Sequence, residues 1–98
     1  MNPEEILREA IAFRKCVRSK YNGDQVTLAP HALYTHFDQN FLYAVTIDRN
    51  GNSPKQTKLG VFKLAGLKSI ALDERAFLPM RKFDSKDSKL KGTVIATV

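Results

Sequence analysis

Residues 40–47 form the most apolar run of strand-forming composition in the chain. Every second residue from Phe41 to Ile47 is apolar, and the three residues between them carry no charge. In a β-strand these two sets lie on opposite faces, so neither face of this strand is strongly polar. Such a strand is covered on both faces, as a central strand of a small barrel is. The flanking segments are therefore expected to supply its neighbours in the sheet.

The chain begins with the signals of a helix. Asn2 is suited to cap it, Pro3 to its first position, and Glu5 to the acidic position of a capping box. Apolar residues then recur at helical spacing as far as Ile11. The pattern predicts a helix from Pro3 to about Arg14, with its apolar face on the sheet that follows.

Five strands are expected after this helix. Asn22-Gly23 is a hairpin signal because both residues tolerate a positive φ. Pro30 interrupts the second strand and indicates an edge, a bend or a bulge there. The five predicted strands cover residues 16–21, 25–28 with an extended continuation over 29–37, 40–47, 56–64 and 67–72.

The end of the chain divides into two parts. The segment 76–79 is predicted to anchor the end of a domain at residues 1–79, and residues 80–98 form a basic tail. The stretch 81–92 lacks a helical apolar stripe and is expected to be a solvated arm. Residues 93–98 are again apolar and β-prone. They either add a strand to an open sheet edge, in this chain or in a neighbouring one, or form an exposed, aggregation-prone segment.

The charge of the chain favours an anionic partner. Its 98 residues carry a formal net charge of +6 with a pI near 9.7, which suits nucleic acid, an anionic membrane surface or an acidic protein, although such a charge also serves solubility alone. The single cysteine, Cys16, excludes a disulfide within the chain and fits a reducing compartment. No apolar run is long enough to cross a bilayer, and the N-terminus has no signal-peptide pattern. We therefore expect a cytoplasmic protein with no membrane partner.

A series of short motifs follows in a fixed order from about Ile6 to Phe77. They are Ala10-Ile11 with Arg14-Lys15; basic residues alternating over 16–23 before Tyr21-Asn22-Gly23; Val26 with Pro30-His31-Ala32-Leu33; Asn40-Phe41-Leu42; and Val61-Phe62-Lys63-Leu64 with Leu67-Lys68-Ser69-Ile70. Together they resemble the WYL domain family. The chain departs from the family pattern at the name-giving tryptophan, which is Asn40 here. It also departs at an arginine that is Lys63, and at an aspartate and second arginine that fall on Ala65 and Gly66.

The resemblance implies a fold and a role. It implies a mainly β protein, an Sm-like small β-barrel of five strands with one N-terminal helix. An extra C-terminal strand is one of the outcomes that the composition of residues 93–98 allows. In bacterial transcription regulators, WYL domains usually follow a DNA-binding helix-turn-helix domain and are thought to sense nucleic acid or nucleotides. No such domain precedes this one, so we expect a stand-alone module.

A basic and aromatic surface is the best candidate for a binding site. Cations neutralise phosphates and rings stack on unpaired bases, which is how single strands are held without sequence readout. In the alternative interpretation the tyrosines belong to the core and the cations form an ordinary solvated face. The predicted nucleic-acid or ligand-binding residues are Arg18, Lys20, Tyr21, His31, Tyr43 and Lys63, with Tyr34 as a further ring.

The sequence favours binding over catalysis. His31 and His36 are a weak metal-ligand set because no carboxylate cluster accompanies them, and Cys16 is more typical of a buried residue than of a nucleophile. No catalytic motif is present. We expect a module without cofactor, metal or enzymatic activity that binds single-stranded DNA or RNA or a nucleotide-like anion in transcription regulation. The alternative is an assembly module that forms homo-oligomers through residues 93–98.

Overall fold

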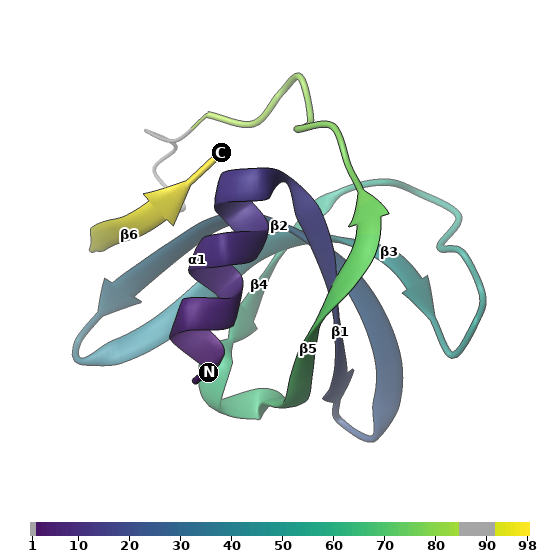
Figure 1. The fold of residues 1–98 in the computed structure, drawn as a ribbon, viewed down its shortest axis with the longest axis horizontal. Coiled ribbons are helices and arrows are strands. Elements are labelled where there is room, and N and C mark those ends of the chain that lie inside the picture. The colour runs from purple at the N-terminus through teal and green to yellow at the C-terminus, as the bar shows by residue number, and fades with distance from the viewer. Residues whose placement is uncertain (1, 85–91) are drawn as a thin grey trace.

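The chain folds into one helix and a six-stranded antiparallel sheet (Figure 1). The structure, a computed structural model, describes residues 2–84 and 92–98. The elements in order are α1 (Pro3–Phe13), β1 (Lys15–Tyr21), β2 (Asp24–His36), β3 (Gln39–Arg49), β4 (Leu59–Lys63), the 3₁₀ turn η1 (Leu64–Gly66), β5 (Leu67–Ala76) and β6 (Thr93–Thr97). The prediction of a mainly β chain with one N-terminal helix is confirmed.

Helix α1 begins and ends through local contacts that the sequence predicts. The Glu5 N–H donates to the Asn2 Oδ1 at 2.9 Å, and the Asn2 amide donates back to the Glu5 carboxylate at 2.9 Å. The first of these bonds satisfies a backbone N–H that the first helical turn leaves free, and the second holds the Asn2 side chain in place. Arg14 adopts a left-handed conformation with φ of 54° and ends the helix. The buried residues Leu7 and Ile11 face the sheet, so the apolar face lies where we expected it.

Strand β2 is the central element because three other strands pair with it. β3 pairs along most of its length, β1 pairs with residues 24–28, and β6 pairs with residues 32–35. Pro30 lies between the end of the β1 pairing and the start of the β6 pairing, where its missing N–H removes no bond to either strand. The register to β3 shifts between Pro30 and Ala32, so His31 is the extra residue of a β-bulge. Of the edge, bend or bulge expected at Pro30, the structure shows a bulge at the following residue. The extended continuation expected over 29–37 belongs to one long strand, which ends at His36.

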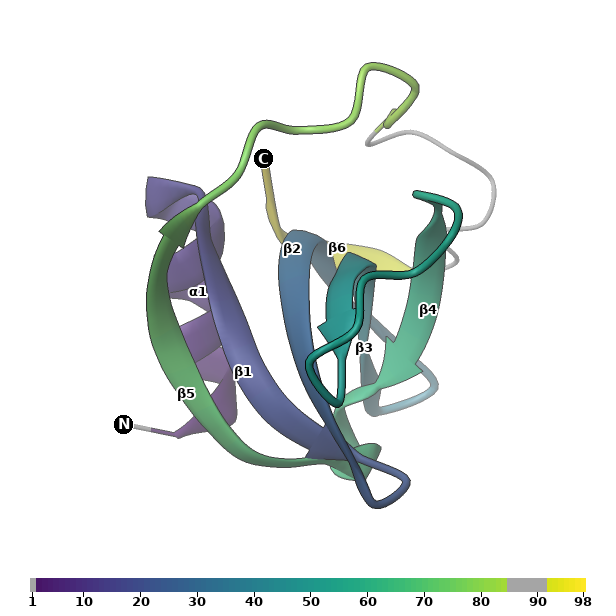
Figure 2. The same ribbon diagram turned by 90° about the vertical axis from the view of Figure 1, so that its right-hand side faces the viewer.

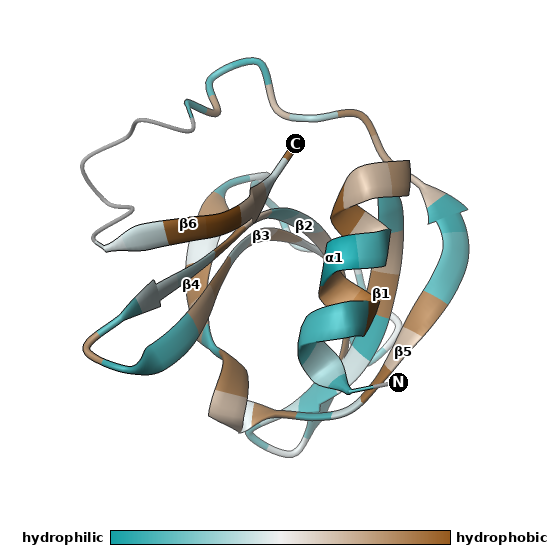
Figure 3. Cartoon of the chain, turned by 60° about the vertical axis from the view of Figure 1, so that its left-hand side comes forward, coloured by the Kyte–Doolittle hydropathy of each residue, from teal (hydrophilic) through white to brown (hydrophobic). Residues whose placement is uncertain are grey.

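The sheet curls but does not close. Its strand order is β4-β3-β2-β1-β5 with β6 beside β2, and within the described residues β4 and β5 do not pair. Figure 3 shows the strands curving around a common centre beside α1. The rings of Tyr21 on β1 and Phe62 on β4 nevertheless meet edge-on, with centroids 5.1 Å apart, although two strands separate them in the sheet. The predicted closed barrel is therefore not confirmed, and the structure shows an open, strongly curved sheet.

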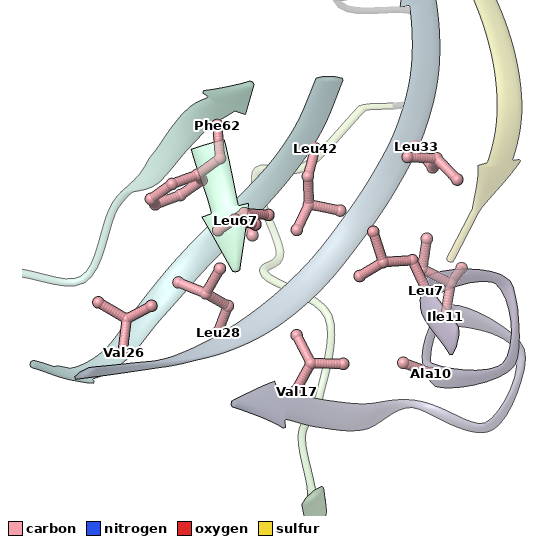
Figure 4. Packing of buried hydrophobic residues seen from close by; sticks show 11 residues of the cluster. Leu7, Ala10, Ile11, Val17, Val26, Leu28, Leu33, Leu42, Phe62 and Leu67 are labelled. Atoms are coloured by element: carbon pink, nitrogen blue, oxygen red, sulfur yellow. The ribbon is translucent and has the colours of Figure 1, made fainter. Parts of the chain in front are cut away.

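The main core fills the concave side of this sheet (Figure 4). It joins residues of α1 to inward-facing residues of β1, β2, β3, β4 and β5. Its buried members are Leu7, Ala10, Ile11, Val17, Val26, Leu28, Leu33, Leu42, Ala44, Phe62 and Leu67. On the inner face of the predicted central strand, Leu42 and Ala44 are fully buried and Thr46 is partly buried.

Part of the convex side of the sheet is covered by residues 77–83, which we call the strap. Phe77 and Met80 pack on a cluster that contains Cys16 and Val45, and Phe83 packs on a neighbouring cluster that contains Tyr43. Figure 2 shows the chain leaving β5 and running across the molecule towards the side of β3 and β4. The prediction that β3 is covered on both faces is confirmed.

The strap and β6 both include residues of the segment 80–98, which was predicted to form a tail. Met80 and Phe83 contact the sheet, and β6 pairs with β2 of the same chain. Of the outcomes expected for residues 93–98, the structure therefore shows addition of a strand to an edge in this chain. The division of the chain into a domain at 1–79 and a tail at 80–98 stays a prediction. The predicted solvated arm at 81–92 lies largely outside the described residues. Among those described, no helix has the length and apolarity to cross a membrane.

Candidate anion-binding surface

Arg18 and Lys20 share an exposed face of β1. The residues on either side of Arg18, Val17 and Ser19, are 0% and 2% exposed, so the strand alternates between core and solvent here. Cys16 points to the same convex face, but the strap covers it. The two predicted cations thus lie on the part of the convex face that the strap leaves open.

Lys68 on β5 joins them from the neighbouring strand. It lies directly opposite Lys20 in the antiparallel register and is exposed. Side chains of directly opposed residues point to the same face, with Cβ atoms about 5 Å apart, and like charges in such a pair are destabilising. Among the described residues neither Lys20 nor Lys68 has a carboxylate ion-pair partner. We call Arg18, Lys20 and Lys68 the basic surface.

A β-bulge in β5 sets this register. The pairing moves from Arg18 with Ala71 to Lys20 with Lys68, so β5 contains one extra residue between these pairs. Ser69 takes up the bend with a φ of 52°. The buried Ser19 hydroxyl donates to the Lys68 carbonyl oxygen at 2.8 Å and holds the bulge against β1. Without the bulge, Lys68 would not face Lys20.

The basic surface borders a shallow depression of about 230 Å³. Its lining residues are Arg18, Ser19, Lys20, Gln25, Ser69 and Ala71. They bring two cations, the Gln25 amide and the Ser69 hydroxyl to the same opening, and each of these groups can donate hydrogen bonds. Among the described residues no carboxylate lines the depression, so its chemistry suits an anion.

The acidic residues of this face lie at one side of it. Asp73 Oδ2 forms an ion pair with Arg18, 3.4 Å from its Nε, and Asp73 Oδ1 accepts a hydrogen bond from the Arg75 backbone N–H at 2.8 Å. Arg75 in turn contacts Asp48 at 3.4 Å. Arg18 is therefore paired with a carboxylate, whereas neither lysine has an ion-pair partner among the described residues.

The structure separates Lys63 from these residues. Lys63 lines a larger pocket of about 550 Å³ between the start of α1, the β2–β3 turn and η1. Asn40, which stands at the family's tryptophan position, lines the same pocket together with Asp38. The Asp38 carboxylate and the Lys63 ammonium group line the same pocket, so the pocket carries both charges and is not purely cationic. Lys63, the last of the six predicted binding residues, thus lines a different pocket from Arg18 and Lys20.

Tyr21 packs against the core instead of facing a ligand. Its ring meets Phe62 on the concave side, and a Cβ added to Gly66 would lie 3.0 Å from the ring. Gly66 stands where the resemblance places the family's second arginine. A residue with a side chain at position 66 would push against the Tyr21 ring, so glycine at this position allows Tyr21 to pack as it does.

His31 and Tyr43 are buried beneath the strap. They are 1% and 3% exposed, and both rings contact Phe83, at 5.3 and 5.8 Å between centroids. The structure therefore brings together Arg18 and Lys20 of the six predicted residues, and it adds Lys68. Burial keeps the His31 and Tyr43 rings from stacking on bases in this arrangement, and the partly exposed Tyr21 ring packs against Phe62.

Metal and nucleophile chemistry have little support in the described part of the chain. Residues 2–84 and 92–98 contain no group of three histidine, cysteine, aspartate or glutamate side chains that would hold a metal ion. His36 lies at the end of β2, where its ring contacts Phe37. Burial raises the pKa of the Cys16 thiol, and Asp73 raises it further, so the reactive thiolate is disfavoured.

The chain matches no protein-family model, no curated protein and no solved structure in the comparisons made. Its likeness to WYL domains therefore rests on the short motifs of the sequence. A function has to be argued from the surface itself.

Proposed function

We propose that this protein is a non-enzymatic module that binds single-stranded nucleic acid through its backbone phosphates on the basic surface. The observation that carries the proposal is the pair Lys20 and Lys68, opposed on neighbouring strands and without a carboxylate partner among the described residues. Opposed like charges cost stability. A bound phosphate between or beside them removes that repulsion and gains a charge-assisted hydrogen bond.

The size of the surface suits one strand of nucleic acid. Arg18 and Lys20 are two residues apart along a strand, which is about 6.6 Å, and Lys68 is one strand away, which is about 4.8 Å. A flexible single strand can adjust its phosphates to such a small group of cations. Because His31 and Tyr43 are buried and Tyr21 packs on Phe62, we expect affinity to come from phosphates and to depend little on base sequence.

The family and the biological role form part of the same proposal. An open variant of the Sm-like small barrel is supported by the N-terminal helix, the curled sheet and the order of the WYL-like motifs. A role in transcription regulation follows from that resemblance alone. The assembly alternative required residues 93–98 to pair with a neighbouring chain, and in the structure β6 pairs with β2 of its own chain.

Removing the two lysines is expected to weaken binding about tenfold at low salt. The test is fluorescence anisotropy of a labelled single-stranded oligonucleotide, with the parent and the double variant Lys20→Gln/Lys68→Gln compared over several salt concentrations. Each lost phosphate contact lowers the log–log salt slope by about 0.7 for single strands, so two lysines should lower it by about 1.4. A surface cation contributes roughly 0.2–1 kcal/mol, which is consistent with a loss of this size for two.

Lys55→Gln/Lys58→Gln is the matched control. Both lysines are exposed on the segment between β3 and β4, and both doubles lower the formal charge from +6 by two units. The control is expected to retain the affinity and the salt slope of the parent. Equal weakening by both doubles would mean that only net charge matters. Absence of binding by the parent at low salt would reject the proposal outright.

Asp73→Asn is expected to tighten binding about threefold, because it frees Arg18 from a competing carboxylate. An exposed ion pair is worth roughly 0.2–1 kcal/mol, which sets the size of the effect. Asparagine keeps the oxygen that accepts the Arg75 N–H, so the local turn is preserved. Glu4→Gln makes the same change in charge and breaks the Glu4–Arg8 ion pair of α1. In the same titration this control should bind like the parent, and an unchanged affinity of Asp73→Asn would place Arg18 outside the site.

A further inference from the structure

His31 connects three parts of the chain at one point. As the extra residue of the β2 bulge, it contacts the Ala29 carbonyl oxygen through Nδ1 at 2.8 Å. Its Nε2 accepts the Met80 N–H of the strap at 3.0 Å. Its backbone oxygen accepts the Val98 N–H at 2.9 Å. The strap is thus held to the sheet by a side-chain hydrogen bond as well as by apolar contacts.

This bonding pattern fixes the protonation state of the ring. A carbonyl oxygen can only accept, so Nδ1 carries the hydrogen, and a backbone N–H can only donate, so Nε2 presents a lone pair. The neutral ring satisfies both partners. A second proton on Nε2 would place an N–H against the Met80 N–H, which removes the bond and leaves two donors facing each other.

The surroundings offer little to stabilise a charged ring. His31 lies between Phe77 and Phe83, with ring centroids at 5.2 and 5.3 Å. The titratable side chains of the buried clusters under the strap are Cys16 on β1, Tyr34 on β2 and Tyr43 on β3. Strand β6 carries no titratable side chain, and the charged residues of the strap and its end, Arg81, Lys82 and Asp84, are exposed. Burial lowers the pKa of the His31 imidazole, and the bond to the Ala29 oxygen offsets only part of this shift.

We propose that His31 is a pH-sensitive switch for the strap: the neutral ring holds residues 77–83 on the convex face, and protonation releases them. Release would expose Cys16, His31 and Tyr43 to solvent. The inference rests on the hydrogen bonds and packing around His31 and is independent of the proposed nucleic-acid binding.

The direction of the switch follows from linkage. The unfolded or released ring has a pKa near 6.5, and the bound ring has a lower one. Below pH 6.5 the released state therefore binds more protons than the closed state, and closure weakens as the pH falls. Above that pH the strap is fully held. The population of the released state is expected to rise by up to about tenfold per pH unit between 6.5 and the pKa of the closed state.

Cys16 is a built-in reporter because the strap covers it in the closed state. The experiment measures its reaction with 4,4′-dithiodipyridine between pH 7.5 and 5, divided at each pH by the rate of a cysteine peptide of the same local sequence. This ratio removes the titration of the thiol itself. The ratio of the parent should rise several-fold as the pH falls below 6.5, while far-UV circular dichroism stays constant. A rise that coincides with loss of the circular dichroism signal would indicate global unfolding and overturn the proposal.

The two histidines of the chain provide the matched variants. His36→Gln should keep the pH dependence, because His36 is partly exposed and does not contact the strap within the described residues. His31→Gln should give a ratio that does not change with pH, because glutamine carries no titrating proton. A rise in His31→Gln like that of the parent would overturn the proposal.

If His31→Gln does not fold, nuclear magnetic resonance of the parent keeps the proposal testable. The His31 ring is expected to titrate below pH 6.5, and the Met80 amide should lose its protection from hydrogen exchange with the same midpoint. Titration of His31 without any change at Met80 would show that the strap stays bound.

Discussion

Replacing Leu42 by alanine is expected to lower the free energy of unfolding by about 3 kcal/mol. The Leu42 side chain is fully buried on the inner face of β3, and Figure 4 shows it among core residues contributed by the neighbouring strands. Truncation removes apolar contacts and leaves a cavity that rigid strands cannot fill. A domain of this size has only about 5–15 kcal/mol of stability in total. Urea denaturation at neutral pH, followed by circular dichroism, measures the change.

Val61→Ala is the control for this prediction. Val61 lies on β4, and its side chain is 49% exposed. Its truncation should cost less than about 1 kcal/mol, because much of the side chain already contacts water. Similar losses for Leu42→Ala and Val61→Ala would contradict the assignment of the concave side as the core.

The second large effect is expected at Gly92, where alanine should detach β6 from β2. Gly92 has a φ of +113°, which residues with a side chain rarely adopt, and a Cβ there would collide with the backbone oxygen of Thr35. Thr93, the next residue, pairs with Thr35. The strain alone is worth about 1–3 kcal/mol, and the collision adds to it. Hydrogen exchange should show the Val98 amide losing the protection that its bond to the His31 oxygen provides.

Gly51→Ala separates strain from collision. Gly51 has a φ of +83°, but a Cβ there would meet no atom within 4 Å. Its replacement should therefore cost about 1 kcal/mol and leave the protection of Val98 unchanged. An equally small effect of Gly92→Ala would mean that β6 does not need this close approach.

Features that depend on neighbours in the sequence were predictable. Asn22 and Gly23 do adopt positive φ values of 51° and 83°, and they connect β1 to β2 by a two-residue turn. The cap at Asn2 also follows its local signal. These signals work because a turn or a cap is decided within about four residues.

In the β2–β3 turn the backbone conformation differs from the one that the local residue types favour. The sequence placed this turn at Asp38 and Gln39, whereas the residues with positive φ are Phe37 and Asp38. Phenylalanine is a poor residue for that conformation. The register between β2 and β3, which buries Leu33 opposite Leu42, fixes the turn one residue earlier. Burial of the two strands outweighs the preference of the turn residue.

The candidate site was predictable only in part, because strand alternation gives a face but not what covers it. Alternation correctly placed Arg18 and Lys20 together. It could not reveal that His31 and Tyr43 face a strap that lies far along the sequence. It also missed Lys68, because a single extra residue in β5 decides which side chain lies opposite Lys20. Such facts depend on long-range packing, which no short motif encodes.

The division of one edge of β2 between β1 and β6 has a consequence for folding in the cell. As the chain leaves the ribosome, residues 32–35 emerge long before their partners in β6, since Ala32 pairs with Thr97. During that interval an unpaired, uncharged strand edge is open to other nascent chains. Co-translational aggregation is therefore the main hazard of this architecture, and a product truncated before residue 93 would carry that hazard permanently.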